Sequence, residues 1–217
     1  MSSYVYMKVL ESMPRRYDRG IGLLSRETIG LVYQRVADLA AGPEKHVLDL
    51  GCGTGSLTMA CAAKGATAVG IDSNAGMLEI ARRKAAGYHG CGSIEFVALD
   101  VMELEDRFGA QSFDAAISCL LFSELTPEER RYVLKTLRQL IKPGGILVIA
   151  EEVIPRKTAS RIWWRLKRAP LAALTWLLTQ TTTSAVDDLE TSIEAAGFSE
   201  VKSEHLAVDF MVVEATC

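Results

Sequence analysis

The sequence predicts an α/β protein with a mostly parallel sheet and helices on both faces. Short apolar runs alternate with helix-like segments between residues 46 and 150. The runs are apolar on both faces, which is typical of strands buried in a parallel sheet. Towards the C-terminus, two strand-like runs are separated only by a tight turn, which permits only an antiparallel pair. We therefore expect five parallel strands closed by an antiparallel pair.

The expected parallel strands are the apolar runs that end in glycine or polar residues. They span His46–Leu50, Thr67–Asp72, Ile94–Asp100, Phe113–Cys119 and Ile146–Ala150. The expected antiparallel pair spans Glu200–Leu206 and Val208–Thr216.

Helices are expected where good helix formers lie between capping and terminating residues. The expected helices span Ser56–Lys64, Ala75–Ala86, a segment from Pro127 to about Ile141, and Asp187–Ala196. Asn74 is a suitable N-cap for the second helix. Thr126 and Glu129 match a capping box around Pro127, which favours the first helical position.

The composition indicates one ordinary globular domain spanning residues 1–217. The chain is 49% hydrophobic and 24% charged, and its formal charge of −3 argues against general nucleic-acid binding. Residues Met1–Tyr4 lack the pattern of a signal peptide, and no apolar run approaches the roughly 18 residues of a membrane span. We expect a cytoplasmic protein.

The cysteines predict neither a disulfide framework nor a metal site. There are five of them, widely spaced and without a C-x-x-C pair. Free thiols in a reducing compartment are the simplest interpretation, and no metal is expected.

The segment from Val47 to Gly55 is the one richest in functional signals. It reads VLDLGCGTG, with three glycines at alternate positions between an expected strand and an expected helix. Such a loop lets the backbone turn tightly and approach a ligand. The dinucleotide fingerprint G-x-G-x-x-G/A would need a small third residue at Ser56 or Thr58, and neither fits.

Three aspartates stand at the expected carboxyl ends of successive strands. Asp49 suits a ligand with a positively charged amino group, and Asp72 lies where an acidic side chain accepts hydrogen bonds from ribose. Asp100 is expected within reach of a base. Open α/β sheets bind ligands at this edge. Any one of these residues alone is equally well explained as a strand-end or cap residue.

Residues 46–151 resemble the class I methyltransferases that use S-adenosylmethionine (SAM), of the methyltransferase-11/25 type. The similarity rests on VLDLGCGTG at 47–55, GIDSN at 70–74, Asp100, FDAAIS at 113–118, and IKPGG at 141–145. GFSEV at 197–201 resembles the start of that family's antiparallel pair. The resemblance implies a Rossmann-like seven-stranded sheet with a reversed last strand. It also implies SAM as cofactor and S-adenosylhomocysteine as its product.

The same resemblance implies which residues bind the cofactor. By this resemblance, the first motif binds the methionine part of SAM and the acid at the end of the second strand binds the ribose. The third-strand aspartate and the residue after it flank the adenine. The residues so implicated are Asp49, Gly51, Cys52, Gly53, Gly55, Asp72, Ser73, Met77, Asp100, Val101 and Ser118. For Met77, a core role is an equal alternative.

The methyl acceptor is expected to contact two segments outside the common core, residues 1–41 as an N-terminal cover and residues 151–186 as an insert. Tyr17 and Asp18 belong to a YD…LS stretch that resembles the segment before the core in quinone-precursor methyltransferases. The alternative for both is a surface turn. The opening residues and the insert also resemble a subgroup associated with corrinoid proteins. The acceptor is therefore expected to be a small molecule or linked to a corrinoid.

Residues 161–180 are dense in aromatic, basic and leucine side chains. A lid over the site, a protein interface and a peripheral membrane contact are the three interpretations of this segment. A lid or interface is favoured because Pro170 interrupts any single long amphipathic helix.

Methyl transfer needs alignment and exclusion of water, and it needs a general base only when the acceptor loses a proton. The candidates are Glu124 and Glu151, with Glu152 beside the latter, and Tyr17 from the N-terminal cover. Two alternatives to an active transferase are a catalytically silent SAM-binding partner or sensor protein and a nucleotide-linked oxidoreductase on the same architecture.

Calorimetry separates the last alternative from the others. We expect SAM and S-adenosylhomocysteine to bind and NAD not to bind, because the glycine spacing departs from the dinucleotide fingerprint. Binding of NAD without binding of SAM or its product would contradict the cofactor assignment.

Overall fold

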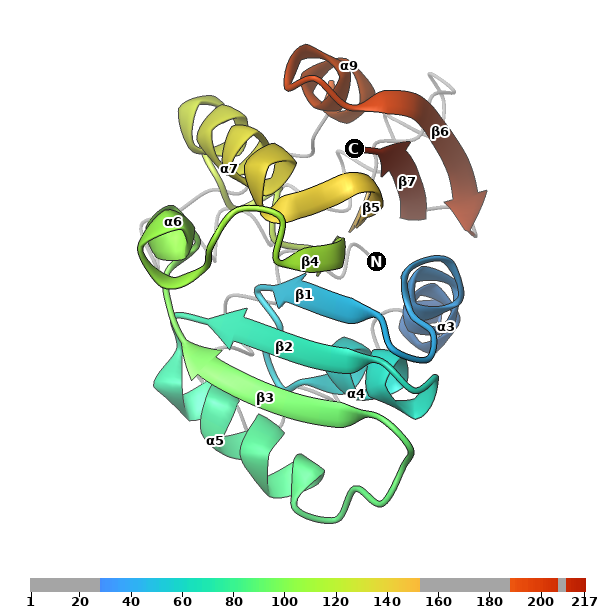
Figure 1. Cartoon of the computed structure of the whole chain (residues 1–217), viewed down its shortest axis with the longest axis vertical. Coiled ribbons are helices and arrows are strands. Elements are labelled where there is room, and N and C mark those ends of the chain that lie inside the picture. The colour runs from blue at the N-terminus through green and yellow to red at the C-terminus, as the bar shows by residue number, and fades with distance from the viewer. Residues whose placement is uncertain (1–27, 153–187, 207–209) are drawn as a thin grey trace, which may run out of the picture.

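A computed structural model describes residues 28–152, 188–206 and 210–217. Its centre is a seven-stranded sheet in the order β3-β2-β1-β4-β5-β7-β6 (Figure 1). The strands are β1 (His46–Leu50), β2 (Thr67–Asp72), β3 (Ser93–Ala98), β4 (Phe113–Cys119), β5 (Ile141–Glu152), β6 (Ser199–Leu206) and β7 (Phe210–Thr216). The arrowheads of β1, β2 and β3 point to the same edge of the sheet in Figure 1.

The strand directions confirm the predicted fold class. The pairs β3–β2, β2–β1, β1–β4 and β4–β5 are parallel. The strand β7 runs antiparallel to both of its neighbours, β5 and β6. The reversed last strand therefore lies inside the sheet, between β5 and β6.

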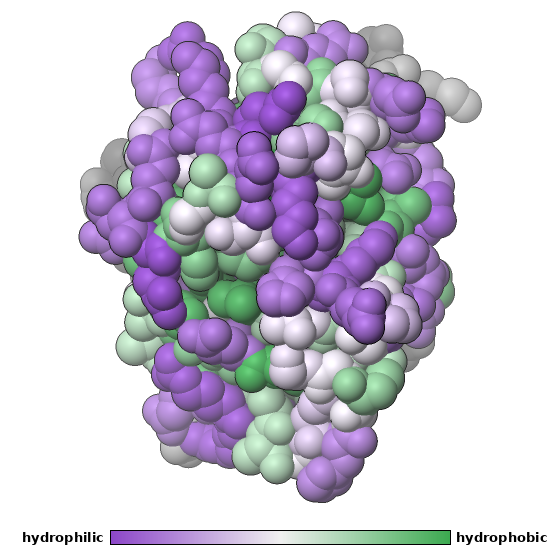
Figure 2. Space-filling model, viewed as in Figure 1, coloured by the Kyte–Doolittle hydropathy of each residue, from purple (hydrophilic) through white to green (hydrophobic). Residues whose placement is uncertain are grey.

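Helices cover both faces of the sheet. They are α3 (Thr28–Ala40), α4 (Ser56–Ala63), α5 (Ala75–Ala85), α6 (Leu104–Arg107), α7 (Pro127–Leu140) and α9 (Leu189–Ala195), with the short 3-10 helix η1 (Val101–Glu103) before α6. One buried cluster joins the sheet to α7 and α9, and a second joins it to α3 and α4. Hydrophilic side chains cover most of the face seen in Figure 2, and hydrophobic ones appear there only in small patches.

The predicted helix caps are present. Asn74 Oδ1 accepts hydrogen bonds from the backbone N–H groups of Gly76 and Met77, which fixes the first turn of α5. At α7, Thr126 Oγ1 accepts from Glu129 N, and Glu129 Oε2 accepts from Thr126 N at 2.7 Å. This complete capping box explains why α7 begins at Pro127.

Some predicted boundaries differ from the observed ones. The strand β3 ends at Ala98, and Asp100 instead caps η1 by accepting from Met102 N at 2.9 Å. The strand β5 begins five residues earlier than expected because Ile141 already pairs with Phe113, before an irregularity in the β4–β5 register. Helix α3 was not among the predicted helices.

Two predicted segments lie largely outside the described residues. The structure describes the N-terminal cover only from residue 28, which excludes Tyr17 and Asp18. It describes the insert of residues 151–186 only at Glu151 and Glu152. Within the described ranges, no helix is long and apolar enough to cross a membrane, and no cluster of potential metal ligands occurs.

The backbone conformation at position 55 and the side chains around it require a glycine, so replacing Gly55 should destabilise the fold. Its φ of +76° is left-handed, and an added Cβ would lie 2.5 Å from Phe96 Cζ. We expect Gly55→Ala to lower the free energy of unfolding by about 2–4 kcal/mol in urea melts. The control is Gly30→Ala in α3, where an added Cβ meets nothing within 4 Å. That change should be neutral or stabilise by about 0.5–1 kcal/mol. Equal effects of the two changes would contradict this account.

Candidate functional site

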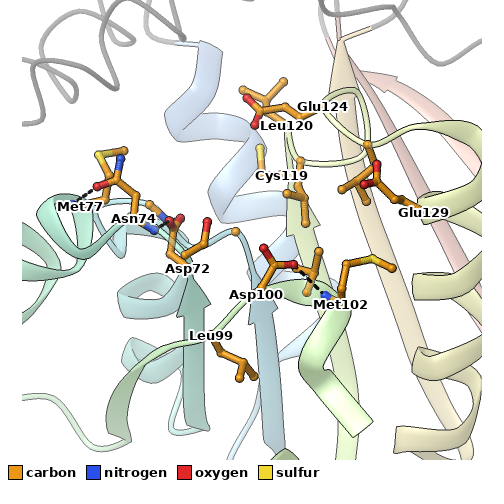
Figure 3. A pocket seen from close by; sticks show the side chains of 16 residues that line it. Asp72, Asn74, Met77, Leu99, Asp100, Met102, Cys119, Leu120, Glu124 and Glu129 are labelled. Atoms are coloured by element: carbon orange, nitrogen blue, oxygen red, sulfur yellow. Dashed lines mark hydrogen bonds between the residues drawn. The ribbon is translucent and has the colours of Figure 1, made fainter. Parts of the chain in front are cut away.

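The main pocket lies where the parallel strands end and has a volume of about 400 Å³. Figure 3 shows Asp72, Asn74 and Met77 on one side of it, and Cys119, Leu120 and Glu124 on another. A smaller cavity adjoins it and shares Gly51, Gly53, Cys119 and Leu120 with it. The two form one continuous site at the edge where open α/β sheets bind ligands.

The glycine loop forms the floor shared by both cavities. Gly53 has a φ of +53°, and its backbone N–H donates to Asp72 Oδ2 at 2.8 Å. An added Cβ at Gly53 would meet Met77 Cε at 3.3 Å, so the loop approaches α5 closely. Cys52 N donates to Ile71 O at 2.9 Å. The loop between β1 and α4 is thereby tied to the end of β2.

Asp72 stands between the loop and helix α5. Its Oδ2 accepts from Gly53 N and its Oδ1 accepts from Asn74 N, each at 2.8 Å. A carboxylate has about four lone-pair positions, so both oxygens can accept further hydrogen bonds from a ligand. The side chain lines the main pocket, which fits the predicted contact with ribose hydroxyls.

Asp49 lies beneath the loop and lines the smaller cavity. It is buried, and its Oδ2 accepts a hydrogen bond from Thr58 Oγ1 at 2.6 Å. Desolvation raises the pKa of Asp49 to about 7, against the lowering effect of the Thr58 hydroxyl, and the charge of Asp72 raises it further. A cationic group in the smaller cavity would favour the ionised carboxylate.

Asp100, Val101 and Met77, the residues predicted to lie near adenine, all line the main pocket. The carboxylate of Asp100 is directed by its bond to Met102 N, and Figure 3 shows it facing the pocket. Met77 is only 3% exposed and also lines the pocket, so a core role and the predicted contact with adenine are compatible. Ser73 also lines the pocket.

Two thiols adjoin the site. Cys52 lines the smaller cavity, and Cys119, at the end of β4, lines both. Desolvation raises the pKa of each thiol well above its usual value, and nearby carboxylates raise it further. Both sulfurs are therefore protonated at neutral pH.

The wall beyond β4 is mostly apolar. Three leucines line it, Leu120, Leu121 and Leu125, together with the acidic side chains of Glu124 and Glu129. Leu120 has a left-handed φ of +66°, which is costly for a leucine. An added Cβ at Gly51 would lie 3.1 Å from Leu121 Cδ1, so this wall packs directly over the glycine loop.

The predicted site residues do not all reach the pocket. Glu124 lines it, but Glu151 is fully buried and lines neither cavity, and its Oε1 accepts from Phe122 N at 2.7 Å. Ser118 is also buried, and its hydroxyl donates to Leu50 O at 3.3 Å. Gly55 packs beside Phe96 and lines neither cavity. Tyr17 lies outside the described residues.

Sequence reasoning missed several residues that line the two cavities. They are Asn74, Leu99, Met102, Cys119, Leu120, Leu121, Leu125 and Glu129 in the larger, and Tyr33, Thr54 and Leu57 in the smaller. A signal existed for the residues after β4, because the carboxyl ends of parallel strands meet at one edge of a sheet. No signal existed for Tyr33, whose helix comes before the first strand.

The site fits SAM on three counts. The volume is in the range of cofactor pockets, and the glycine loop brings backbone close to the cavity without side chains. Asp72 offers carboxylate oxygens for ribose, and Asp49 offers a carboxyl for the amino group. When bound, SAM supplies an electrophilic methyl group on its sulfonium.

Comparison with known proteins gives a consistent result. Residues 47–145 match a family model described as a methyltransferase domain. The demethylmenaquinone methyltransferase of Clavibacter sepedonicus is 36% identical over 171 residues, which cover 78% of this chain and 67% of that protein. The carboxy-S-adenosyl-L-methionine synthase of Shewanella loihica is 27% identical over 152 residues, which cover 67% of this chain and 58% of that protein. This chain thus spans little more than half of the second relative.

The fold also matches solved structures. A SAM-dependent methyltransferase from Methanosarcina mazei superposes with a TM-score of 0.62 at 21% identity, covering 82% of this chain and 95% of that one. At this identity the similarity supports the architecture rather than the substrate.

The raised pKa of Asp49 predicts a pH dependence of SAM binding. The ammonium of SAM would pair with the ionised carboxylate, so binding requires Asp49 to lose its proton and should tighten as pH rises towards 7. Between pH 5.5 and 7, where the amino group of SAM stays protonated, we expect the affinity to increase roughly tenfold by calorimetry. Asp49→Asn, which keeps an acceptor for Thr58, should remove this dependence. An equally steep profile in the variant would rule out Asp49 as its source.

Proposed function

Because this chain belongs to the family of class I SAM-dependent methyltransferases and uses SAM as its cofactor, we propose that it methylates a small, largely apolar acceptor of the quinone-precursor class. The transferase activity and cofactor follow from the family. The chemical class of the methyl acceptor is what we propose in addition.

The observation that carries this proposal is the apolar wall after β4. Leu120, Leu121 and Leu125 line the same pocket as the glycine loop and Asp72. Figure 3 shows Leu120 and Glu124 across the pocket from Asp72 and Met77, and an acceptor against this wall would approach a bound cofactor from that side. Apolar side chains favour a ring or chain that loses little hydration on entry.

The chain's own residues have two tasks in such a transfer. They align the acceptor with the methyl group and exclude water from the reacting atoms. As the acceptor's nucleophilic atom bonds to the methyl carbon, the carbon–sulfur pair of electrons stays on sulfur and gives the neutral thioether. An acceptor that carries a hydrogen on that atom then loses a proton. Glu124 is the predicted base that lines the pocket, and we assign it to receive this proton.

The similarity to a demethylmenaquinone methyltransferase supports the quinone-precursor class. The similarity to a carboxy-S-adenosyl-L-methionine synthase is a reason to test the acceptor directly, because that relative's name denotes a different product. A corrinoid-linked acceptor stays a prediction from the sequence, since the insert on which it depends lies almost entirely outside the described residues.

The test is turnover with SAM and a short-chain demethylated quinol, with methylated product and S-adenosylhomocysteine measured by mass spectrometry. We expect product with the quinol and much less with small amines, thiols or a corrinoid protein. Asp72→Ala should weaken SAM binding roughly 10–100-fold, because both oxygens of Asp72 hold the site together.

Glu79→Ala is the matched control, because Glu79 lies on the outer side of α5 and pairs with Arg83. This variant should keep both SAM binding and turnover. If SAM bound but no acceptor were methylated, the silent partner or sensor interpretation would replace this proposal. Faster transfer to an amine, a thiol or the corrinoid protein would overturn the acceptor class alone.

A further inference from the structure

The backbone of Phe122 is held from two sides by side chains of other elements. Its N–H donates to Glu151 Oε1 on β5 at 2.7 Å, and its carbonyl accepts from Arg130 Nε on α7 at 2.6 Å. Glu151 is fully buried and Arg130 is 7% exposed. Phe122 itself belongs to the core cluster that joins the sheet to α7. The loop after β4 is therefore fixed to both the sheet and the helix.

The segment held in this way is the wall on the acceptor side of the pocket. Leu120, Leu121, Glu124 and Leu125 all line the pocket, and Phe122 lies among them in the sequence. The left-handed conformation of Leu120 costs about 1–3 kcal/mol and persists only where neighbouring contacts impose it. Leu120 N donates to Ala150 O at 2.9 Å, directly before Glu151. The same end of β5 thus holds two backbone groups of the loop.

The position of Glu151 suits a residue that holds backbone rather than one that receives a proton from a substrate. It lines neither cavity, and one oxygen is already bonded to Phe122 N. Burial raises the pKa of Glu151 to about 8, against the lowering effects of the Ser123 and Phe122 groups, and the charge of Glu124 raises it further. A neutral carboxyl still accepts through its carbonyl oxygen.

Arg130 has the complementary position. Its Nη2 is buried without a hydrogen-bond partner, as is Glu151 Oε2. An unsatisfied buried polar group calls for an explanation, and the bonds that its other atoms form are the first place to look for one. The bonds formed here are with the loop after β4: Arg130 donates to Phe122 O, and Glu151 accepts from Phe122 N and interacts with Ser123.

We propose that Glu151 and Arg130 are positioning residues, which hold the loop of residues 120–125 in the conformation that shapes the acceptor side of the pocket. The link to the acceptor rests on the proposed function. The hold on Phe122 rests on the hydrogen bonds alone, and it can be tested without any acceptor.

Hydrogen exchange followed by mass spectrometry, on peptides covering residues 118–126, tests the hold directly. Glu151→Ala should make the Phe122 amide exchange at least roughly tenfold faster, because the amide loses its acceptor. Glu151→Gln should stay within about threefold of the wild type, because the amide oxygen of glutamine accepts the same bond. Unchanged exchange in Glu151→Ala would overturn the proposal.

Arg130→Met and Arg131→Met form a matched pair on α7. Arg131 is exposed and pairs with Glu128, so its loss should leave exchange in the loop unchanged, whereas loss of Arg130 should accelerate it. If Glu151→Ala does not fold, this pair of variants still tests whether side chains from other elements hold the loop. Equal exchange in the two variants would count against the proposal.

Steady-state kinetics test the consequence for the acceptor. Glu151→Ala and Arg130→Met should raise KM for the acceptor roughly tenfold and raise KM for SAM by much less, because most of the loop faces the acceptor and only Leu120 and Leu121 reach the glycine loop. Glu151→Gln should keep kcat and its pH profile. Loss of activity in Glu151→Gln to the level of Glu151→Ala would identify an ionised carboxylate in catalysis and refute a positioning role. If the wild type methylated no quinol, the proposed function would fail while the exchange results still stood.

Discussion

The site depends on one carboxylate that bonds to two backbone segments at once. Asp72 ends β2, and its two oxygens accept from Gly53 in the glycine loop and from Asn74 at the start of α5. Together with the bond from Cys52 N to Ile71 O, that anchor fixes a loop whose glycines adopt left-handed conformations. Because the anchor is also the predicted ribose ligand, cofactor binding and loop order are coupled. Charge-assisted bonds to backbone N–H groups are strong enough to set such a conformation.

The opposite wall of the pocket is organised by the same physical means. There the loop after β4 is held by Glu151 and Arg130, and the strain at Leu120 shows that the backbone is constrained. On both walls a side chain from a regular element fixes irregular backbone, and the ligand-facing groups are then presented by the loops. The sheet supplies the rigid frame, since its strands contribute to both buried clusters and pack there against the helices on either face.

The sequence predicted the parts of the fold that rest on local signals. Apolar runs that end in glycine or polar residues located β1, β2 and β4 to the residue, and the capping box located the start of α7. It did not predict that β3 ends before Asp100, because a strand-end aspartate and a cap look alike in a single chain. For the site, motif positions identified Asp72 and Met77. The sequence did not predict that Glu151 bonds to Phe122 N and stays outside the pocket, since this contact depends on how β5 and α7 pack.

The two thiols beside the pocket lie close enough to a bound cofactor for methylation of the protein itself to matter. A sulfonium methyl group alkylates thiolates readily, and sulfur is a better nucleophile than most acceptor atoms when it is ionised. Desolvation and neighbouring carboxylates keep Cys52 and Cys119 protonated at neutral pH. The burial that completes the walls of the cavity therefore also protects the enzyme against self-alkylation, and reserves the methyl group for the substrate.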